Sequence, residues 1–360
     1  MNMSALNCSA IINASSSTNC TAWSPFVGYS EPTELAILRL LAYAVIFVLG
    51  VGGNLLVILA IRRPQMKSVT NVFITNLAVA DFLVCLLNVP MVTTLGHLGY
   101  WPFGEFMCKF LSSFQGVSLS ASVGTLIAVA ADRFKMIVLY QRPNTKIYQA
   151  YMYVALIWIS STALPFPLLL FSHVIQGPNG KDLCVEIWPD ASSRKMYTLL
   201  VVILLYFIPL GAISVLYSLI IRKLWSLSES QKVSQQRQKR IVRMLVIVVI
   251  LFAVCWLPYH ILFLYLDFGD PQITYSMLSA IMSTQWFIYS NSACNPIVYA
   301  VFNTNYRREF ARMLRCKRNE RRAGKNNEIK MNRKELEKNI SITDSCEDDS
   351  VTSCMSTTAI

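Results

Sequence analysis

Charged side chains are scarce in this sequence. Only 14% of its 360 residues are Asp, Glu, Lys or Arg, whereas a typical soluble domain carries about 25%. Hydrophobic residues make up 54% of the chain. This balance argues against an ordinary soluble domain and favours a protein that lies in lipid.

The sequence contains seven long apolar segments. About 18 or more consecutive apolar residues cross a hydrocarbon core of about 30 Å as a helix. Prolines inside such segments are tolerated in a membrane, where neighbouring helices satisfy the freed backbone groups. We therefore predict an all-α membrane protein, a seven-transmembrane helix bundle. The seven predicted spans are residues 37–61, 72–95, 110–140, 151–171, 197–224, 241–268 and 275–302.

Lysine and arginine are absent from residues 1–35 and gather in 62–67, 222–240 and 307–338. Because cytoplasmic loops hold the positive excess, the N-terminus is predicted to be extracellular and the C-terminus cytoplasmic. Glycosylation triplets modified only on the lumenal side crowd into the first segment. We attribute the net charge of +12 to topology and attraction to lipid rather than to nucleic-acid binding. The four acceptor asparagines are Asn2, Asn7, Asn13 and Asn19.

The ten cysteines show no metal-binding spacing. In the predicted topology Cys108 and Cys184 both face the oxidising side, where a disulfide persists, and we expect them to be bridged. Cys8 and Cys20 either form a second pair or stay free. The sequence thus predicts one disulfide across the outer side of the bundle.

A short amphipathic segment follows the seventh span. Tyr306, Phe310 and Leu314 recur every four residues beside arginines, which predicts a helix at about 305–315 on the inner leaflet. Cys316 directly after it is a palmitoylation candidate.

Seven short motifs occur in order, one in each predicted span. They are Gly53-Asn54, "NLAVAD" at 76–81, Asp132-Arg133-Phe134, Trp158, Pro209 with Tyr217, "CWLPY" at 255–259 and "NPIVY" at 295–299. On these motifs, residues 37–316 resemble the rhodopsin-like G protein-coupled receptors. The resemblance implies a plasma-membrane receptor, not an enzyme, that activates heterotrimeric G proteins.

An acid-base pair closes the third predicted span. Charges are costly at membrane depth and usually mark function, yet Asp132 and Arg133 can neutralise each other. In the family, this arginine is held in the resting state and helps to form the G protein pocket on activation. The alternatives are an interfacial anchor for the pair and plain packing for the aromatic residues. The resemblance implies a G protein switch of Asp132, Arg133, Tyr217, Tyr299, Asn295 and Pro296, and a toggle and packing core of Trp256, Phe252, Pro209 and Val123.

Asp81 is a second charge within a predicted span. A carboxylate near mid-membrane needs a counter-ion or a proton, and hard cations prefer oxygen ligands. The resemblance places short oxygen-bearing side chains around it and implies an allosteric sodium site, with no other cofactor. The alternative is a protonated Asp81 in a polar core. The implied sodium ligands are Asp81, Ser122, Asn291, Ser292 and Asn295, with Asn54 beside them.

The ligand class is narrowed by two absences. Gln115 stands where amine receptors of this family need a carboxylate, and residues 275–302 lack the lysine of retinal proteins. Gln115, "WPFG" at 101–104, "QGVSLSASV" at 115–123 and Asp267 most resemble the neuropeptide FF, RFamide and neuropeptide Y receptors, whose peptides end in Arg-aromatic-amide. The ligand-binding residues implied are Gln115, Asp267, Tyr259, His260, Glu186 and Gln285.

The predicted outer end is acidic, with few basic residues, and would attract a cationic ligand. Each exposed acid has the alternative of being solvated surface. Residues 173–188 carry a Gly-Pro-Asn-Gly turn between β-prone flanks, which predicts a hairpin, held by Cys184, that acts as a peptide-binding lid. The acids concerned are Glu31, Glu34, Glu105, Asp182, Glu186, Asp190, Asp267 and Asp270.

We expect three parts: a glycosylated tail at 1–35, the receptor domain with its surface helix at 36–316, and a disordered regulatory tail at 317–360. Residues 358–360 have the form of a PDZ ligand or are a plain end. Another peptide class is the alternative ligand, and a secondary transporter the rival class, although no internal repeat is visible. Candidate phosphosites for arrestin recruitment are Ser341, Thr343, Ser345, Ser350, Thr352 and Ser353.

Overall fold

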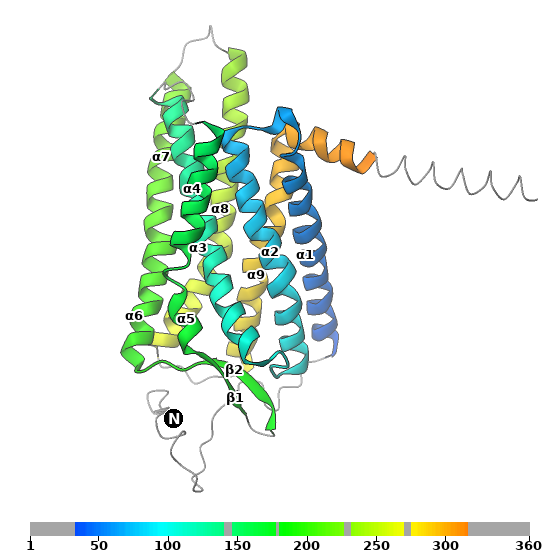
Figure 1. Cartoon of the computed structure of the whole chain (residues 1–360), viewed down its shortest axis with the longest axis vertical. Helices are drawn as coiled ribbons and strands as arrows, with labels where there is room; N and C mark the ends of the chain where they lie inside the picture. The colour runs from blue at the N-terminus through cyan, green and yellow to red at the C-terminus, as the bar shows by residue number, and fades with distance from the viewer. Residues whose placement is uncertain (1–32, 140–145, 178–179, 227–231, 270–274, 316–360) are drawn as a thin grey trace, which may run out of the picture. The chain divides into compact units, whose positions relative to one another are not determined.

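The computed structural model describes residues 33–139, 146–177, 180–226, 232–269 and 275–315. Within the unit Met1–Arg307 the helices form a bundle in which α1 packs against α2 and α9, α3 against α2, α4 and α7, and α8 against α9 (Figure 1). In chain order the elements are α1 (Thr33–Ala60), η3 (Pro64–Met66), α2 (Val69–Leu98), α3 (Gly104–Ile137), α4 (Ile147–Ser161), α5 (Phe166–Phe171), β1 (Ser172–Gln176), β2 (Asp182–Glu186), α6 (Ala191–Val202), η5 (Ile203–Phe207), α7 (Ile208–Ser226), α8 (Lys232–Phe268) and α9 (Tyr275–Phe302).

Five of the described helical segments are long and apolar enough to cross a bilayer. They include α1, α2, α3, the continuous α6–η5–α7 segment and the apolar part of α8. The prediction of a membrane-spanning helical bundle is confirmed.

The fourth predicted span, 151–171, is not one continuous helix. A turn at 162–165 separates α4 from α5, so this detail of the prediction was wrong. Pro165 and Pro167 lack the backbone N–H that would continue the helix, and their rings clash with the preceding turn. Pro165 instead packs closely against Gly116 of α3. A Cβ added to Gly116 would lie only 2.8 Å from the Cβ of Pro165.

The helix ends follow local capping chemistry. The hydroxyl of Ser68 accepts a hydrogen bond from the backbone N–H of Asn71 at 3.3 Å at the start of α2. Gly99 ends that helix with φ of 69°, a left-handed conformation that favours glycine. At the start of α6, the Asp190 carboxylate accepts from the backbone N–H of Ser193 at 2.8 Å.

The predicted hairpin is confirmed. Strands β1 and β2 pair antiparallel, with Val174 opposite Cys184. The backbone N–H of Gly177 donates to the carbonyl of Lys181 at 2.7 Å, and Gly180 adopts φ of 68°. Both strands contact α3. We call the end of the bundle that carries β1 and β2 the hairpin end.

Residues 304–315 are also helical, and the division of the chain into Met1–Arg307 and Arg308–Ile360 falls within this stretch. The predicted lipid anchor at Cys316, the four glycosylation asparagines, Cys8, Cys20 and the regulatory tail lie outside the described residues.

Candidate functional site

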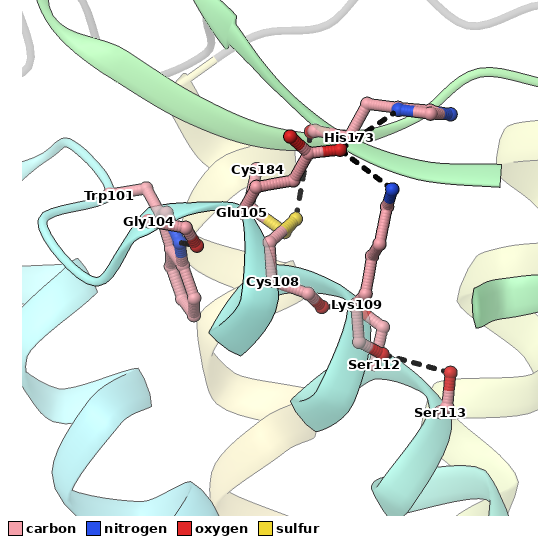
Figure 2. The surroundings of a disulfide bond; sticks show 9 residues. All are labelled: Trp101, Gly104, Glu105, Cys108, Lys109, Ser112, Ser113, His173 and Cys184. Carbon is pink, nitrogen blue, oxygen red and sulfur yellow. Dashed lines mark hydrogen bonds and ion pairs between the residues drawn. A yellow bond between two sulfur atoms is a disulfide. The ribbon is translucent and has the colours of Figure 1, made fainter. Parts of the chain in front are cut away.

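A disulfide ties the hairpin to the bundle. It joins Cys108 of α3 to Cys184 of β2, as the sequence predicted (Figure 2). Trp101 and Leu111 pack around it in a buried apolar cluster. The backbone N–H of Trp101 donates to the carbonyl of Asp182 at 2.7 Å. The "WPFG" segment therefore has a structural role here: it packs beside the disulfide and against β2.

Several acids of the hairpin end already have partners. The Glu105 carboxylate lies 2.6 Å from the Lys109 ammonium and 3.6 Å from Nδ1 of His173 (Figure 2). Asp190 caps α6, and the hydrogen bonds from the backbone N–H and the hydroxyl of Ser193 lower its pKa below the ordinary value. Glu31 and Asp270 lie outside the described residues.

Glu186 is one of two exposed acids of β2, the other being Asp182. Its carboxylate accepts a hydrogen bond from Nε1 of Trp188 at 2.8 Å. Within the described part of the chain no Lys, Arg or His forms an ion pair with it. The Trp188 ring lies 4.9 Å from that of Tyr197 in α6. Glu186 is therefore a negative charge still open to a cation.

Asp267 is not the solvated acid that its position near the end of α8 suggested. Its side chain is only 3% exposed, and its Oδ1 lies 2.9 Å from Nε of Arg194 in α6. The hydroxyl of Thr198 donates to Oδ2 at 2.5 Å. We call Arg194, Thr198 and Asp267 the clasp. Sequence reasoning missed Arg194, whose only signal was a basic residue close to the predicted acidic rim.

Gln115 forms the centre of a polar network deeper in the bundle. Its Oε1 accepts from Nδ2 of Asn88 at 3.3 Å and from the Tyr289 hydroxyl at 3.4 Å. Its Nε2 donates to Oε1 of Gln285 at 3.5 Å. We call these four residues the Gln115 network. The structure thus brings together Gln115 and Gln285, two predicted ligand residues 170 positions apart.

Asn88 and Tyr289 were not predicted, although both are polar groups inside apolar helices. Asn88 is 3% exposed and Tyr289 is fully buried. A polar group at membrane depth must be hydrogen-bonded, and this requirement is the signal that would have found them.

An aromatic layer lies between α8 and the α6–α7 segment. It comprises Tyr206, Phe252, Trp256, Tyr259 and His260. The His260 ring lies 4.9 Å from that of Tyr206 and 5.9 Å from that of Trp256. His260 is 2% exposed, so a ligand would reach it only if this layer opened. Sequence reasoning missed Tyr206, whose hydroxyl donates to the Ala253 carbonyl at 2.9 Å.

Asp81 lies in a buried polar site between α2 and α9. The Ser292 hydroxyl and Nδ2 of Asn295 each donate to its carboxylate at 2.7 Å. A cavity of about 20 Å³ adjoins it, lined in part by Gln115, Ser122 and Trp256. This cavity therefore connects the polar site with the Gln115 network and the aromatic layer.

The donor set around Asp81 suits a hard cation. Asn291 and Ser118 line the cavity, and the Oδ1 of Asn291 and the Oγ of Ser118 have no hydrogen-bond partner among the described residues. Buried polar atoms without partners are rare and call for an ion or a water. Carboxylate, amide and hydroxyl oxygens are the ligands that hard cations prefer.

The Asp132–Arg133 pair lies at the other end of α3. Their side chains are 3.2 Å apart, and the Thr70 hydroxyl of α2 donates to the same Asp132 oxygen at 2.8 Å. Arg133 is 7% exposed. No hydrogen bond in the described residues joins it to Tyr217 or Tyr299, both of which are buried. Thr70 was missed, because an isolated threonine gives no sequence signal.

Val123 and Pro209, the other two residues of the predicted packing core, are buried, and Pro296 of the predicted switch lies at a close helix contact. Val123 of α3 is 3% exposed, and Pro209 lies at the start of α7 just after the π-helical turn η5. Pro296 of α9 packs against α1, since a Cβ on Gly53 would lie 2.8 Å from its Cβ. Pro296 therefore lies where α1 and α9 approach each other closely.

Comparison with known proteins gives a consistent result. Residues 53–299 match the family described as 7 transmembrane receptor (rhodopsin family). The chain is 32% identical over 323 residues to neuropeptide FF receptor 1 of Homo sapiens, covering 83% of this chain and 75% of that receptor. It is 31% identical over 286 residues to galanin receptor type 1 of Rattus norvegicus (78% and 83% covered). It is 30% identical over 320 residues to neuropeptide Y receptor type 6 of Mus musculus (83% and 86% covered).

Proposed function

The chain belongs to the rhodopsin family of seven-transmembrane receptors, and we propose that its ligand is a neuropeptide that ends in Arg-aromatic-amide. As a member of this family it is a multi-pass plasma-membrane receptor, not an enzyme, and its partners are a peptide and a heterotrimeric G protein. In this proposal the hairpin end faces outward and the Asp132–Arg133 end faces the cytoplasm.

The Gln115 network is the observation that carries the proposed ligand class. A C-terminal carboxamide both donates and accepts hydrogen bonds, and the side-chain amides of Gln115, Gln285 and Asn88 offer both functions. Their mutual bonds of 3.3–3.5 Å are long, so exchanging them for bonds to a ligand costs little. A free carboxylate would only accept, and would bring a charge into this apolar depth.

The acids above this network supply the second half of the proposal. Tyr259 and Asp267 are eight residues apart on α8, so Asp267 lies about 12 Å nearer the hairpin end than Tyr259 does. An arginine two residues from the amide reaches this level, and its planar fork suits a carboxylate. We assign Asp267 and the exposed Glu186 to this arginine. Tyr259 borders the aromatic side chain of the peptide, and His260 borders it once the aromatic layer opens.

The hairpin acts as the lid over this site in our proposal. Cys184 fixes β2 to α3, while Glu186 follows two residues later on the same strand. Alternate residues of a strand lie on the same face, so the disulfide also fixes the position of the Glu186 carboxylate.

We further propose that Asp132 and Arg133 form the G protein switch. Thr70 and Asp132 hold Arg133 in the resting arrangement, and Tyr217, Tyr299, Asn295 and Pro296 receive it on activation. The ion pair of 3.2 Å and the hydrogen bond from Thr70 support this assignment. A sodium ion at Asp81, with Ser122, Asn291, Ser292 and Asn295, would favour the resting arrangement. Such an ion would supply positive charge to the buried Asp81 carboxylate.

The remaining assignments concern the ends of the chain. We propose glycosylation at Asn2, Asn7, Asn13 and Asn19, a lipid-facing position for residues 304–315, and palmitoylation of Cys316. We also propose arrestin binding through the phosphorylated tail and a PDZ partner at residues 358–360. Their support is the sequence pattern of these segments.

The decisive experiment measures G protein activation by the expressed receptor with matched peptides. The panel contains a peptide ending in Arg-Phe-amide, the same peptide as a free acid, and an analogue with citrulline in place of arginine. We expect the amidated arginine peptide to be the most potent. Equal potency of amide and free acid, or activation only by unrelated peptides, would exclude the proposed ligand class.

A further inference from the structure

Each charge of the clasp stands at the unfavourable end of its own helix. Arg194 is the fourth residue of α6, and Asp267 is the last but one of α8. A helix carries partial positive charge at its N-terminus and partial negative charge at its C-terminus, so a cation in the first turn and an anion in the last turn are both disfavoured. Their ion pair of 2.9 Å offsets both effects.

Burial makes the pairing of Asp267 more demanding still. Its side chain is 3% exposed, whereas that of Arg194 is 34% exposed. An unpaired buried charge is strongly destabilising, so the buried Asp267 carboxylate is stabilised by a cation beside it. Arg194 can swing into solvent, but Asp267 cannot. The carboxylate is therefore the fixed member of the pair and the guanidinium is the replaceable one.

We propose that Arg194 is an internal substitute for the ligand's arginine, so that peptide binding exchanges one guanidinium for another on Asp267. This inference rests on the proposed ligand class, since only a cationic peptide can take the place of Arg194. In the unliganded receptor the clasp joins the hairpin-end termini of α6 and α8. In the bound receptor the peptide holds Asp267, and the direct tie between the two helices is lost.

The surroundings of the clasp favour such an exchange. Thr198 keeps its hydrogen bond to Oδ2 of Asp267, the oxygen not facing Arg194 Nε, and so holds the carboxylate in place during the exchange. Nε1 of Trp188 donates to the Glu186 carboxylate, and the Trp188 ring packs against that of Tyr197 in α6, the residue next to Thr198. Glu186 thus supplies a second negative charge near the clasp while the guanidinium groups of Arg194 and of the peptide are both present.

Arg194 also sets specificity in this scheme. A peptide that lacks a cation cannot compensate Asp267, so it leaves the clasp closed and gains nothing from the carboxylate. A cationic peptide must compete with Arg194. Its apparent affinity is therefore its intrinsic affinity multiplied by the fraction of receptors in which Asp267 is open.

The test compares Arg194→Gln with Lys195→Gln as a matched control. Lys195 is the next residue of α6, and its ammonium lies over the Phe268 ring at 5.4 Å rather than on Asp267. We expect Arg194→Gln to raise the potency of the Arg-Phe-amide peptide about tenfold, and to leave the citrulline analogue unchanged. Lys195→Gln should change neither. Equal or lower potency of the arginine peptide on Arg194→Gln would overturn the exchange.

A charge-swapped receptor, Arg194→Asp with Asp267→Arg, tests the same proposal if the single variant folds poorly. The swap retains an ion pair, and each charge now stands at the favourable end of its helix. It should therefore be at least as thermally stable as the parent without peptide. It should also lose the preference for arginine over citrulline and favour an analogue with glutamate at that position. A stable swapped receptor that still prefers arginine would refute the proposal.

The two proposals fail differently. If the parent receptor does not respond to any Arg-aromatic-amide peptide, the proposed ligand class fails. If the parent responds but Arg194→Gln shows no selective gain for the arginine peptide, the ligand class stands and the exchange fails.

Discussion

Single polar side chains buried in apolar helices form the candidate sites of this receptor. Gln115, Asp81 and Asp267 lie on different helices, and each is hydrogen-bonded or ion-paired in a different way. A buried polar group is stable only with partners. Each site is therefore defined by its partners as much as by the residue that the sequence first indicated.

Gln115 gives the prediction at this scale. Gln115→Ala should lower the potency of an amidated peptide about tenfold, because one or two hydrogen bonds to the amide are lost at about 0.5–1.5 kcal/mol each. The free-acid peptide should change little. The measurement is the dose response of G protein activation for the amide and the acid.

Gln176→Ala is the control, since Gln176 is exposed at the end of β1. An equal loss for amide and acid peptides on Gln115→Ala would show that Gln115 does not distinguish the amide.

At the scale of helices and strands, contacts between glycine and proline set how closely two helices pack. α1 approaches α9 so closely at Gly53 that an added Cβ would lie 2.8 Å from the Cβ of Pro296, whereas nothing lies within 4 Å of a Cβ on Gly52. The two glycines are adjacent on one helix but face different surroundings. Only the tertiary structure distinguishes their roles.

This difference predicts opposite outcomes for two adjacent substitutions. Gly53→Ala should destabilise the receptor by about 1–3 kcal/mol, because α1 and α9 must move apart. Gly52→Ala should be neutral or stabilising by up to about 1 kcal/mol, because alanine favours helix over glycine. Thermal unfolding of the purified receptor measures both. Similar melting temperatures for the two variants would contradict the close contact.

The disulfide acts on the position of the hairpin. Cys184→Ala should impair surface expression and peptide binding, since such bonds typically contribute about 2–4 kcal/mol and this one fixes β2 to α3. Cys294→Ala, at a free cysteine of α9, is the control and should bind peptide as the parent does. Normal peptide binding by Cys184→Ala would mean that the hairpin holds its position without the bond.

At the scale of the whole molecule, the two ends are linked through the middle of the bundle. The cavity beside Asp81 is bordered by Gln115 and Trp256, while Asn295 bonds directly to Asp81. A ligand that binds one arrangement of this region more tightly shifts the population toward it. In our proposal, the polar site couples ligand binding with the Arg133 switch.

Sodium provides the test of this coupling. It should lower agonist affinity in the parent receptor by roughly fivefold or more, and much less in Asp81→Asn. Asn291→Ala should also weaken the effect, because it removes an oxygen without a partner among the described residues. Ser290→Ala is the matched control, as its hydroxyl bonds to the Trp286 carbonyl within α9. Equal sodium sensitivity in all four receptors would rule out a sodium site.

The sequence by itself determined the class of this protein. Apolar length predicted the helices, turn residues predicted the hairpin, and the cysteine compartments predicted the Cys108–Cys184 bond, because each of these depends on local composition or on topology alone. The ordered motifs indicated the family in the same way. Even the break of the fourth span at Pro165 was readable in principle, since proline interrupts a helix wherever it lacks compensation.

Only the tertiary structure decided which side chains meet. Arg194 and Asp267 are 73 residues apart, and Gln115 and Gln285 are 170 apart. No local pattern encodes such pairs. Thr70 and Asn88 gained roles for the same reason, because the helix facing each one supplies its partner. An aspartate near the end of a helix is expected to be exposed. Packing of α6 against α8 instead buries the Asp267 side chain and supplies its cation. Burial and charge compensation depend on the packed neighbours, and these exist only once the bundle has folded.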